Sequence, residues 1–234
     1  DYAMPGVVAD GNGDVFFAGG SDPVPELGGK TPPRGRTEDL GVVAARYDAS
    51  GRLIWRKRFG GGSPYLNASI ALDPQGDPVI AGSFGGRLDF GGGELPRSGS
   101  LSDVFLAALD RDGGHRWSRS FGGTGWQGLA GLVVRGDGAI LATGQFEGGA
   151  IDLGGGPLPS AGSSDVWLAA WDGTGRHLWS RSFGDYHVQF PGGIALDSRG
   201  DIVLAGSFSS SIDFGDGPLV SAGAHDVFLV KLTP

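Results

Sequence analysis

The sequence contains no cysteine, and only 19% of its residues are charged. Without cysteine the chain can form neither a disulfide framework nor a thiolate zinc site, and it offers no cysteine nucleophile. No uninterrupted apolar run approaches the length of about 20 residues that a transmembrane helix needs. The formal net charge of -8 opposes a general affinity for nucleic-acid phosphates, which requires clustered Lys and Arg. We therefore expect neither a nucleic-acid-binding protein nor a helical membrane span.

Glycine, in contrast, is abundant, with 47 of 234 residues. The glycines follow no Gly-X-Y period and stand among Val, Ile, Leu, Phe and Trp, which excludes a collagen helix and a flexible linker. A helix-rich fold is also excluded, because each interior glycine costs a helix about 1 kcal/mol relative to alanine. The hydrophobic content of 39% is sufficient for a core. The composition therefore predicts an all-β chain of short strands and tight turns.

An internal repeat organises the chain. Trp55, Trp117 and Trp179 are separated by 62 and 62 residues, and each opens a Trp-x-(Lys/Arg)-x-Phe-Gly string. The stretches that precede these strings also align, at residues 8–14, 70–77, 132–138 and 194–201. We infer four repeats of about 62 residues, at approximately 1–62, 63–124, 125–186 and 187–234.

Each repeat has the pattern of four strands. In the fourth repeat, a short strand at 193–196 is followed by an Asp-x-x-Gly turn and a second strand at 201–208. A glycine-rich loop then leads to the most apolar strand, at 227–232, and in the other repeats a further Asp-x-x-Gly turn precedes the Trp-containing strand. The turn glycine supplies the positive φ of a hairpin. Each repeat is therefore predicted to be an antiparallel meander.

Four-stranded meanders repeated at this interval are typical of β-propeller blades. A β-solenoid rung is much shorter than these repeats. The small residues of the first strands and the large aromatic residues of the fourth strands also match the taper of a propeller blade from axis to rim. We therefore predict an all-β fold, a single β-propeller domain over residues 1–234.

Two strings carry a resemblance to a known family. Residues 193–208, Gly-Ile-Ala-Leu-Asp-Ser-Arg-Gly-Asp-Ile-Val-Leu-Ala-Gly-Ser-Phe, and residues 103–110, Asp-Val-Phe-Leu-Ala-Ala-Leu-Asp, resemble the bacterial beta-propeller repeat family (SBBP-like repeats), with a weaker likeness to NHL-type blades. The first repeat departs from the pattern, since Gly41 replaces the strand-opening aspartate and segment 20–40 lacks the Asp-Phe-Gly string. The resemblance implies a bacterial protein that is extracellular or on the cell surface.

The fourth repeat stops at Pro234, just after its third strand, so 15 strands are expected in place of 16. Two interpretations follow. Either the chain forms a four-bladed ring whose last blade lacks its outer strand, which we favour, or it is a piece of a larger propeller. Self-association through the incomplete fourth blade is a further expectation.

Recurring aspartates are the first candidates for chemistry. Three fall in the glycine-rich loops and three open the third strands: Asp89, Asp152, Asp213, Asp103, Asp165 and Asp226. We expect each to accept backbone N–H bonds and shape its own loop, with a Ca²⁺ site as the alternative and no other cofactor predicted. The Asp10–Asp14 string and the Arg-Gly-Asp strings at 135–137 and 199–201 are expected to be hairpin turns. No His shows metal-ligand spacing.

The predicted binding residues belong to the loops that join one repeat to the next. Aromatic and amide side chains gather there, namely Tyr2, Tyr65, Trp126, Gln127, Tyr186, His187 and Gln189. Rings beside amides form a platform for a sugar or a protein hot spot. We therefore expect a noncatalytic binding or assembly module with a protein or glycan ligand. The alternatives are a lyase or hydrolase that uses axial aspartates and His187, and a purely structural repeat of a larger surface protein.

Overall fold

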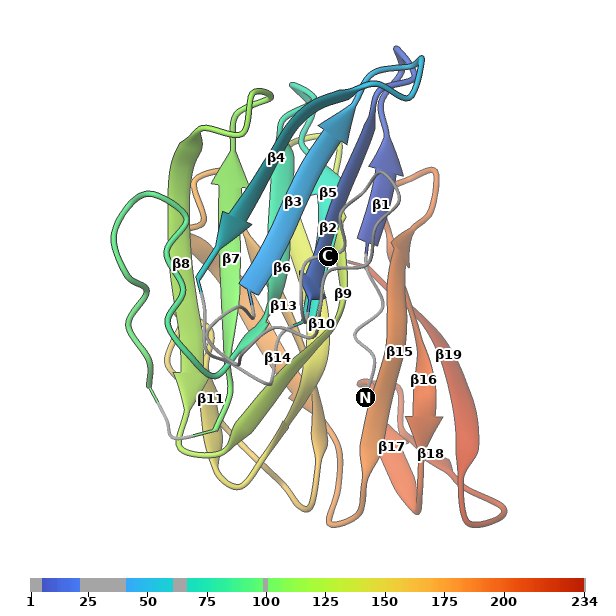
Figure 1. Ribbon diagram of the computed structural model, residues 1–234. Helices are drawn as coiled ribbons and strands as arrows, with labels where there is room; N and C mark the ends of the chain where they lie inside the picture. The colour runs from blue at the N-terminus through green and yellow to red at the C-terminus, as the bar shows by residue number, and fades with distance from the viewer. Residues whose placement is uncertain (1–5, 22–40, 61–66, 99–100, 234) are drawn as a thin grey trace. The chain divides into compact units, whose positions relative to one another are not determined.

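The computed structural model describes residues 6–21, 41–60, 67–98 and 101–233, and the regular elements of these residues are β-strands (Figure 1). No helix within these ranges could cross a membrane. The chain divides into two compact units. Unit 1 comprises residues up to 97 together with 104–120, and unit 2 comprises residues 98–103 together with those from 121 onward.

The first two repeats form antiparallel sheets whose strands follow chain order. The first sheet consists of β1 (Gly6–Ala9), β2 (Val15–Ser21), β3 (Gly41–Tyr47) and β4 (Leu53–Phe59). The second contains, in the same order, β5 (Asn67–Leu72), β6 (Pro78–Phe84), β7 (Asp103–Leu109) and β8 (His115–Gly123). The predicted meander is therefore confirmed in both.

The third and fourth repeats follow the same plan. The third sheet consists of β9 (Trp126–Val134), β10 (Ile140–Glu147), β13 (Asp165–Trp171) and β14 (His177–Phe183). The fourth has three strands, β15 (Gln189–Leu196), β16 (Ile202–Phe208) and β19 (Asp226–Leu232). The all-β prediction is confirmed, and the chain contains several four-stranded antiparallel sheets.

The glycine-rich loops contain short hairpins that the sequence pattern does not predict. In the third repeat, β11 (Ala150–Asp152) pairs with β12 (Pro157–Pro159), and β11 also pairs with Gly122 and Gly123 at the end of β8. In the fourth repeat, β17 (Ser211–Asp213) pairs with β18 (Pro218–Val220). Strands of three residues, of which β12 and β18 begin with proline, give too short a pattern to recognise. These hairpins make the loops ordered structures rather than irregular connections.

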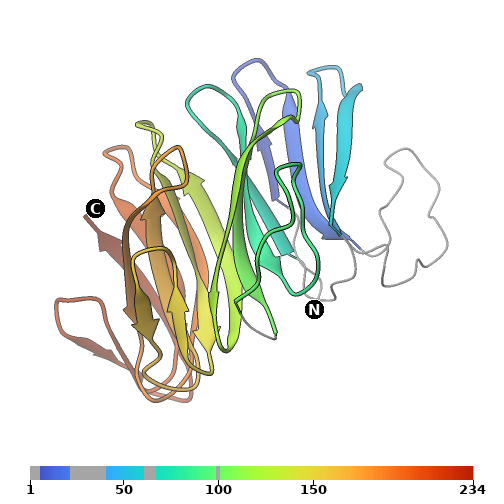
Figure 2. The ribbon, with the colours of Figure 1, turned by 90° about the vertical axis from the view of Figure 1, so that its left-hand side faces the viewer.

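Each unit has its own hydrophobic core between consecutive sheets. In unit 1, buried side chains of the first and second sheets form one cluster that includes Phe16, Val42, Phe59, Ile80, Phe84 and Phe105. In unit 2, the third and fourth sheets lie side by side (Figure 2) and share Leu141, Val166, Leu168, Ile202, Leu204 and Phe208. Burial of these large side chains is the main favourable term in holding neighbouring sheets together, at about 1.5–3 kcal/mol each.

The hairpin turn 135–138 provides a direct test of the turn chemistry. Gly138 has a φ of +88°, whereas Gly136 in the same turn does not have a positive φ, and a Cβ added to either glycine would meet no other atom within 4 Å. A Cβ at Gly138 therefore strains the backbone without causing a clash. We expect Gly138→Ala to lower the free energy of unfolding by about 1–2 kcal/mol. Gly136→Ala is the matched control and should leave stability unchanged or slightly raised. Urea unfolding measures both, and equal losses would contradict this account of the turn.

Candidate functional site

The Asp-x-x-Gly turns are closed by the side chains of their aspartates. In the turn between β13 and β14, Oδ1 of Asp172 accepts hydrogen bonds from the N–H groups of Thr174 at 2.9 Å and Arg176 at 3.0 Å. Gly175 adopts the expected positive φ of 75°. The same two bonds, from residues i+2 and i+4, recur at Asp10, Asp48, Asp73, Asp110 and Asp197. These carboxylates are therefore structural elements of the hairpins.

The aspartates of the glycine-rich loops also accept hydrogen bonds from backbone N–H groups of their own loops. Oδ1 of Asp152 accepts from the N–H groups of Gly154 at 2.8 Å and Gly156 at 3.1 Å. Asp89 and Asp213 make the equivalent pairs of bonds. The expectation that each of these aspartates shapes its own loop is confirmed.

The aspartates that open the third strands also bond to nearby loop segments. Oδ2 of Asp165 accepts from the Ser160 hydroxyl at 2.6 Å and the Ala161 N–H at 2.7 Å. Asp226 does the same with Ser221 and Ala222, and Asp103 accepts from the Ser98 N–H. Within the described ranges, no three His, Asp or Glu side chains converge on one metal position. The predicted alternative of a shared acidic ring has no such geometry there.

In each Arg-Gly-Asp string, the arginine and the aspartate form an ion pair with one another. Arg135 and Asp137 form an ion pair with one another at 2.7 Å, and the hydrogen bond from Arg135 lowers the pKa of Asp137 to about 2. In the second string, Arg199 pairs with Asp201 at 3.1 Å. Both strings lie on hairpin turns, as predicted.

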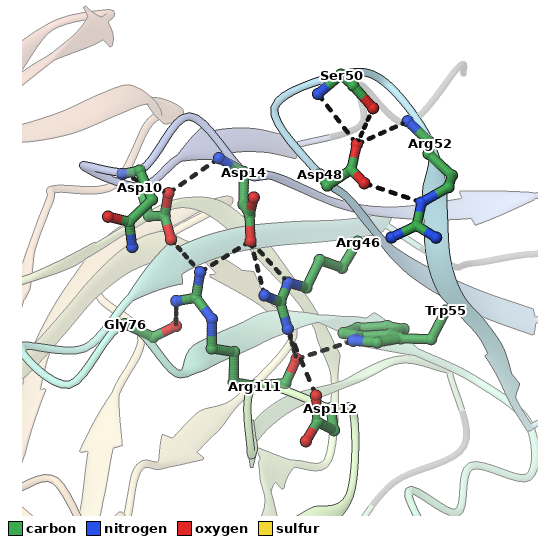
Figure 3. A network of polar contacts seen from close by, with 11 residues as sticks. Asp10, Asp14, Arg46, Asp48, Ser50, Arg52, Trp55, Gly76, Arg111 and Asp112 are labelled. Carbon is green, nitrogen blue, oxygen red and sulfur yellow. Dashed lines mark hydrogen bonds and ion pairs between the residues drawn. The ribbon is translucent and has the colours of Figure 1, made fainter.

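A polar network in unit 1 joins hairpin turns of its two sheets (Figure 3). Arg111 donates to Asp10 and to Asp14, while Arg46 donates to Asp14 at 2.6 Å. The carbonyl of Arg111 accepts from Trp55 Nε1 at 2.8 Å and from Arg46 at 3.2 Å. Hydrogen bonds from Arg111 and Arg46 lower the pKa values of Asp10 and Asp14, respectively, so both carboxylates stay charged. The network therefore links hairpin turns of the first sheet to hairpin turns of the second sheet by hydrogen bonds and ion pairs.

Two histidines pack on glycine-rich loops. Nε2 of His115 and the Ser118 hydroxyl are 3.0 Å apart, and His177 and Ser180 repeat this contact at 3.0 Å. A Cβ on Gly92 would lie 2.7 Å from Nε2 of His115, and one on Gly155 would meet His177 in the same way. The repeated geometry indicates that these rings support their loops.

Of the predicted aromatic binding residues, Tyr2 and Tyr65 lie outside the described residues. Tyr186 is 78% exposed, and its ring stands edge-on to that of His187, with 5.2 Å between the centroids. These two neighbours form an exposed aromatic pair between β14 and β15.

The remaining predicted binding residues lie in strands rather than in loops. Trp126 and Gln127 begin β9, and Gln189 begins β15. Gln127 is 1% exposed and Gln189 is fully buried. The sequence pattern places these residues in connecting loops because it begins the first strand of each repeat several residues too late. The glutamines therefore offer no surface for direct contact with a partner.

A shallow cavity of about 410 Å³ lies beside Tyr186 in unit 2. It lies between the turn after β10 and the segment that follows β12, and is lined by Gly148, Gly149, Ala150, Pro159, Ser160, Ala161 and Gly162. A Cβ on Gly162 would lie 2.5 Å from the carbonyl oxygen of Tyr186, so cavity wall and Tyr186 backbone are in direct contact. The sequence offers no signal for the cavity, because its lining is mostly backbone of small residues.

Asp185 fixes the backbone that carries the exposed pair. Its carboxylate accepts from the His187 N–H at 2.8 Å, from Gln189 Nε2 at 2.7 Å and from the Ser211 hydroxyl at 2.8 Å. Burial alone would raise the pKa of Asp185, but these hydrogen bonds lower it to about 2. A charged Asp185 therefore holds Tyr186 and His187 in place at neutral pH.

The depressed pKa of Asp185 predicts an acid-sensitive contribution to stability. Because the folded-state pKa of about 2 lies below the unfolded value of about 3.9, the carboxylate stabilises the folded protein above about pH 4, and this contribution is lost as the pH falls towards about 2. We expect Asp185→Asn to be less stable at neutral pH and to lose less stability between these pH values. Denaturant unfolding at several pH values measures this. The exposed Asp216→Asn is the control, and identical pH profiles for both variants would contradict the assignment.

Comparisons with known proteins identify no family. No family model matches the chain, and no curated protein matches it. Two solved structures, described as "glucose dehydrogenase" and "Crystal structure of glucose dehydrogenase", align with a TM-score of 0.38 and 14% identity over 86% of this chain. They are covered over 76% and 78% of their own lengths. A likeness at this level assigns no function, and the resemblance to the bacterial beta-propeller repeat family stays a prediction.

Proposed function

We propose that this protein is a noncatalytic binding module of a bacterial cell surface or secreted protein, and that it recognises a glycan at the cavity beside Tyr186. The proposal rests on a cavity of about 410 Å³ whose wall at Gly162 contacts the backbone of Tyr186, together with the 78% exposure of the Tyr186 side chain. An exposed tyrosine offers a large contact area with few rotatable bonds. Backbone groups of the glycine-rich wall supply hydrogen-bonding partners for hydroxyl groups.

The character of the lining favours recognition over catalysis. The seven lining residues are Gly, Ala, Pro and Ser, and none carries an ionisable side chain. The hydroxyl of Ser160 already donates to Asp165. General acid–base chemistry needs a titratable group within hydrogen-bond reach of the substrate. A lyase or hydrolase activity at this cavity is therefore less favoured than binding. If no glycan binds, a protein ligand at the same surface becomes the favoured alternative.

The architecture we propose is a β-propeller. It is supported by repeated four-stranded meanders and by the face-to-face packing of consecutive sheets within each unit. In such a ring the loops that carry Tyr186 and the cavity belong to a single face.

Self-association is a second proposal, supported by the exposed face of β19. Val227 and Leu229 are 85% and 75% exposed, whereas Val166 and Leu168, at the equivalent positions of β13, are 0% and 1% exposed and pack in the core shared with the fourth sheet. Exposed apolar side chains on the last strand of a sheet favour a contact with a further strand or sheet. We propose that a second copy of the chain provides it.

The glycan proposal predicts that Tyr186→Ala weakens binding by about thirtyfold, the effect of losing a hot spot worth about 2 kcal/mol. A glycan array identifies the ligand, and titration calorimetry gives the affinities. Leu178→Ala, at a half-exposed apolar residue of β14, is the control and should bind as the wild type does. Equal affinity of Tyr186→Ala and wild type for the glycan would remove Tyr186 from the site.

The self-association proposal predicts a concentration-dependent dimer in sedimentation velocity. Substitution of both Val227 and Leu229 by Lys places two charges on the apolar face and should give a monomer at all concentrations. Leu178→Lys, which adds a charge to an exposed residue of β14, should leave the dimer intact. A wild-type protein that remains monomeric, or a double variant that still dimerises, would overturn the proposal.

A further inference from the structure

Three buried oxygen-bearing residues lie where β13 and β15 begin. Ser164, Asp165 and Gln189 are 3%, 1% and 0% exposed. The chain segments that carry them are joined directly, since the Gln189 N–H donates to the Ser164 carbonyl at 2.9 Å. All three belong to unit 2. The cluster is therefore a fixed feature of the third and fourth repeats.

The orientation of the Gln189 side chain is determined by its neighbour. Its Nε2 donates to the carboxylate of Asp185 at 2.7 Å, which can only accept. The amide oxygen, Oε1, consequently faces Gly184. A Cβ added to Gly184 would lie 2.6 Å from this oxygen and would collide with Oδ1 of Asp165. Two acceptor oxygens thus approach the same glycine.

These oxygens have no donor among the described residues. Oδ1 of Asp165, Oε1 of Gln189 and Oγ of Ser164 are fully buried and without a hydrogen-bond partner there. The other oxygen of Asp165 accepts only from neutral groups, the Ser160 hydroxyl and the Ala161 and Gly162 N–H groups. Burial of a carboxylate is costly unless a positive charge or sufficient hydrogen bonds compensate it. Two converging acceptors repel one another unless a cation or a donor lies between them.

We propose that Asp165, Gln189 and Ser164 are ligands of a calcium ion. A carboxylate, an amide carbonyl and a hydroxyl are the hard oxygen ligands that Ca²⁺ takes, and its flexible coordination tolerates a site assembled from two strand ends. Mg²⁺ demands stricter octahedral geometry and shorter distances. The site contains a single carboxylate, which is why neither the spacing of acidic residues nor a cluster of acidic side chains reveals it.

The preceding repeat contains a related pair of buried residues. The Gln127 N–H donates to the Ser102 carbonyl at 3.1 Å, as Gln189 does to Ser164. Ser102 and Gln127 are each 1% exposed, and their side-chain polar atoms have no partner among the described residues. The buried Ser–Gln pair therefore recurs, but Gly123 stands in the place of Asp185, so nothing among the described residues orients the Gln127 amide as Asp185 orients that of Gln189.

The site can be tested on the whole chain without knowledge of the glycan. The protein is stripped with a chelator, and thermal unfolding is followed with Ca²⁺, Mg²⁺ or Na⁺. Terbium, a luminescent substitute for Ca²⁺, reports binding directly, because Trp167 lies on the same strand as Asp165 and can sensitise its emission. Ser164→Ala removes one proposed ligand without removing a side-chain hydrogen bond of the described structure. Asp165→Asn removes the charge, and Ser207→Ala, at a half-buried serine on β16, is the matched control.

The proposal predicts that Ca²⁺ raises the melting temperature and that chelation reverses the increase. Ser164→Ala should weaken terbium and calcium binding about tenfold. Ser207→Ala should bind both ions as the wild type does. Asp165→Asn should abolish the response. A melting temperature insensitive to Ca²⁺, an equal response to Mg²⁺, or undiminished binding by Ser164→Ala would overturn it. An increase in stability of Ser164→Ala together with no response to Ca²⁺ would identify the cluster as a water-filled polar pocket.

Discussion

The interaction on which the structure depends is the hydrogen bonding of aspartate carboxylates to backbone N–H groups in turns and loops. A chain of short strands has many reversals, and each leaves N–H groups that neither strand can satisfy. One oxygen of an aspartate satisfies two of them, as Asp172 does in a hairpin and Asp152 does in a glycine-rich loop. The acidic composition follows from this requirement, since most recurring aspartates are committed to the backbone.

Consecutive sheets within each unit pack through apolar side chains. In unit 2, Val166 and Leu168 of one sheet belong to the same core cluster as Ile202 and Leu204 of the next, and all four are fully or almost fully buried. The equivalent face of β19 instead exposes Val227 and Leu229. Equivalent Val and Leu positions of the repeat are therefore buried in β13 and exposed in β19. This difference is the physical basis for the proposed self-association.

Much of the fold could be predicted from the sequence because its signals are local. The Trp spacing gives the repeat length, the Asp-x-x-Gly strings locate hairpin turns, and the apolar runs locate third strands such as β7 and β13. Two kinds of feature could not be predicted. The hairpins β11–β12 and β17–β18 are too short for a periodic pattern. The starts of β9 and β15 lie before the apolar residues that mark them, so the pattern assigns Gln127 and Gln189 to loops.

The candidate site was less predictable, because it depends on contacts between residues that are distant in the sequence. Tyr186 and His187 are recognisable from composition, and they lie exposed as an aromatic pair. The cavity beside them has walls of small residues and backbone, which carry no signature. The buried cluster of Ser164, Asp165 and Gln189 depends on side chains 24 positions apart, joined by strand pairing. Contacts between repeats are set by tertiary packing, which a reading of each repeat separately does not capture.

Hydrogen bonds to aspartate carboxylates hold the glycine-rich loops in defined structures, and this role can be measured at single residues. Site-resolved amide hydrogen exchange tests it most directly at Gly154 and Gly156, whose N–H groups donate to Asp152. Both amides should exchange much more slowly than freely exposed glycine amides at neutral pH, and Asp152→Ala should abolish this protection without unfolding β13. Exchange at the rate of an unstructured loop in the wild-type protein would contradict it.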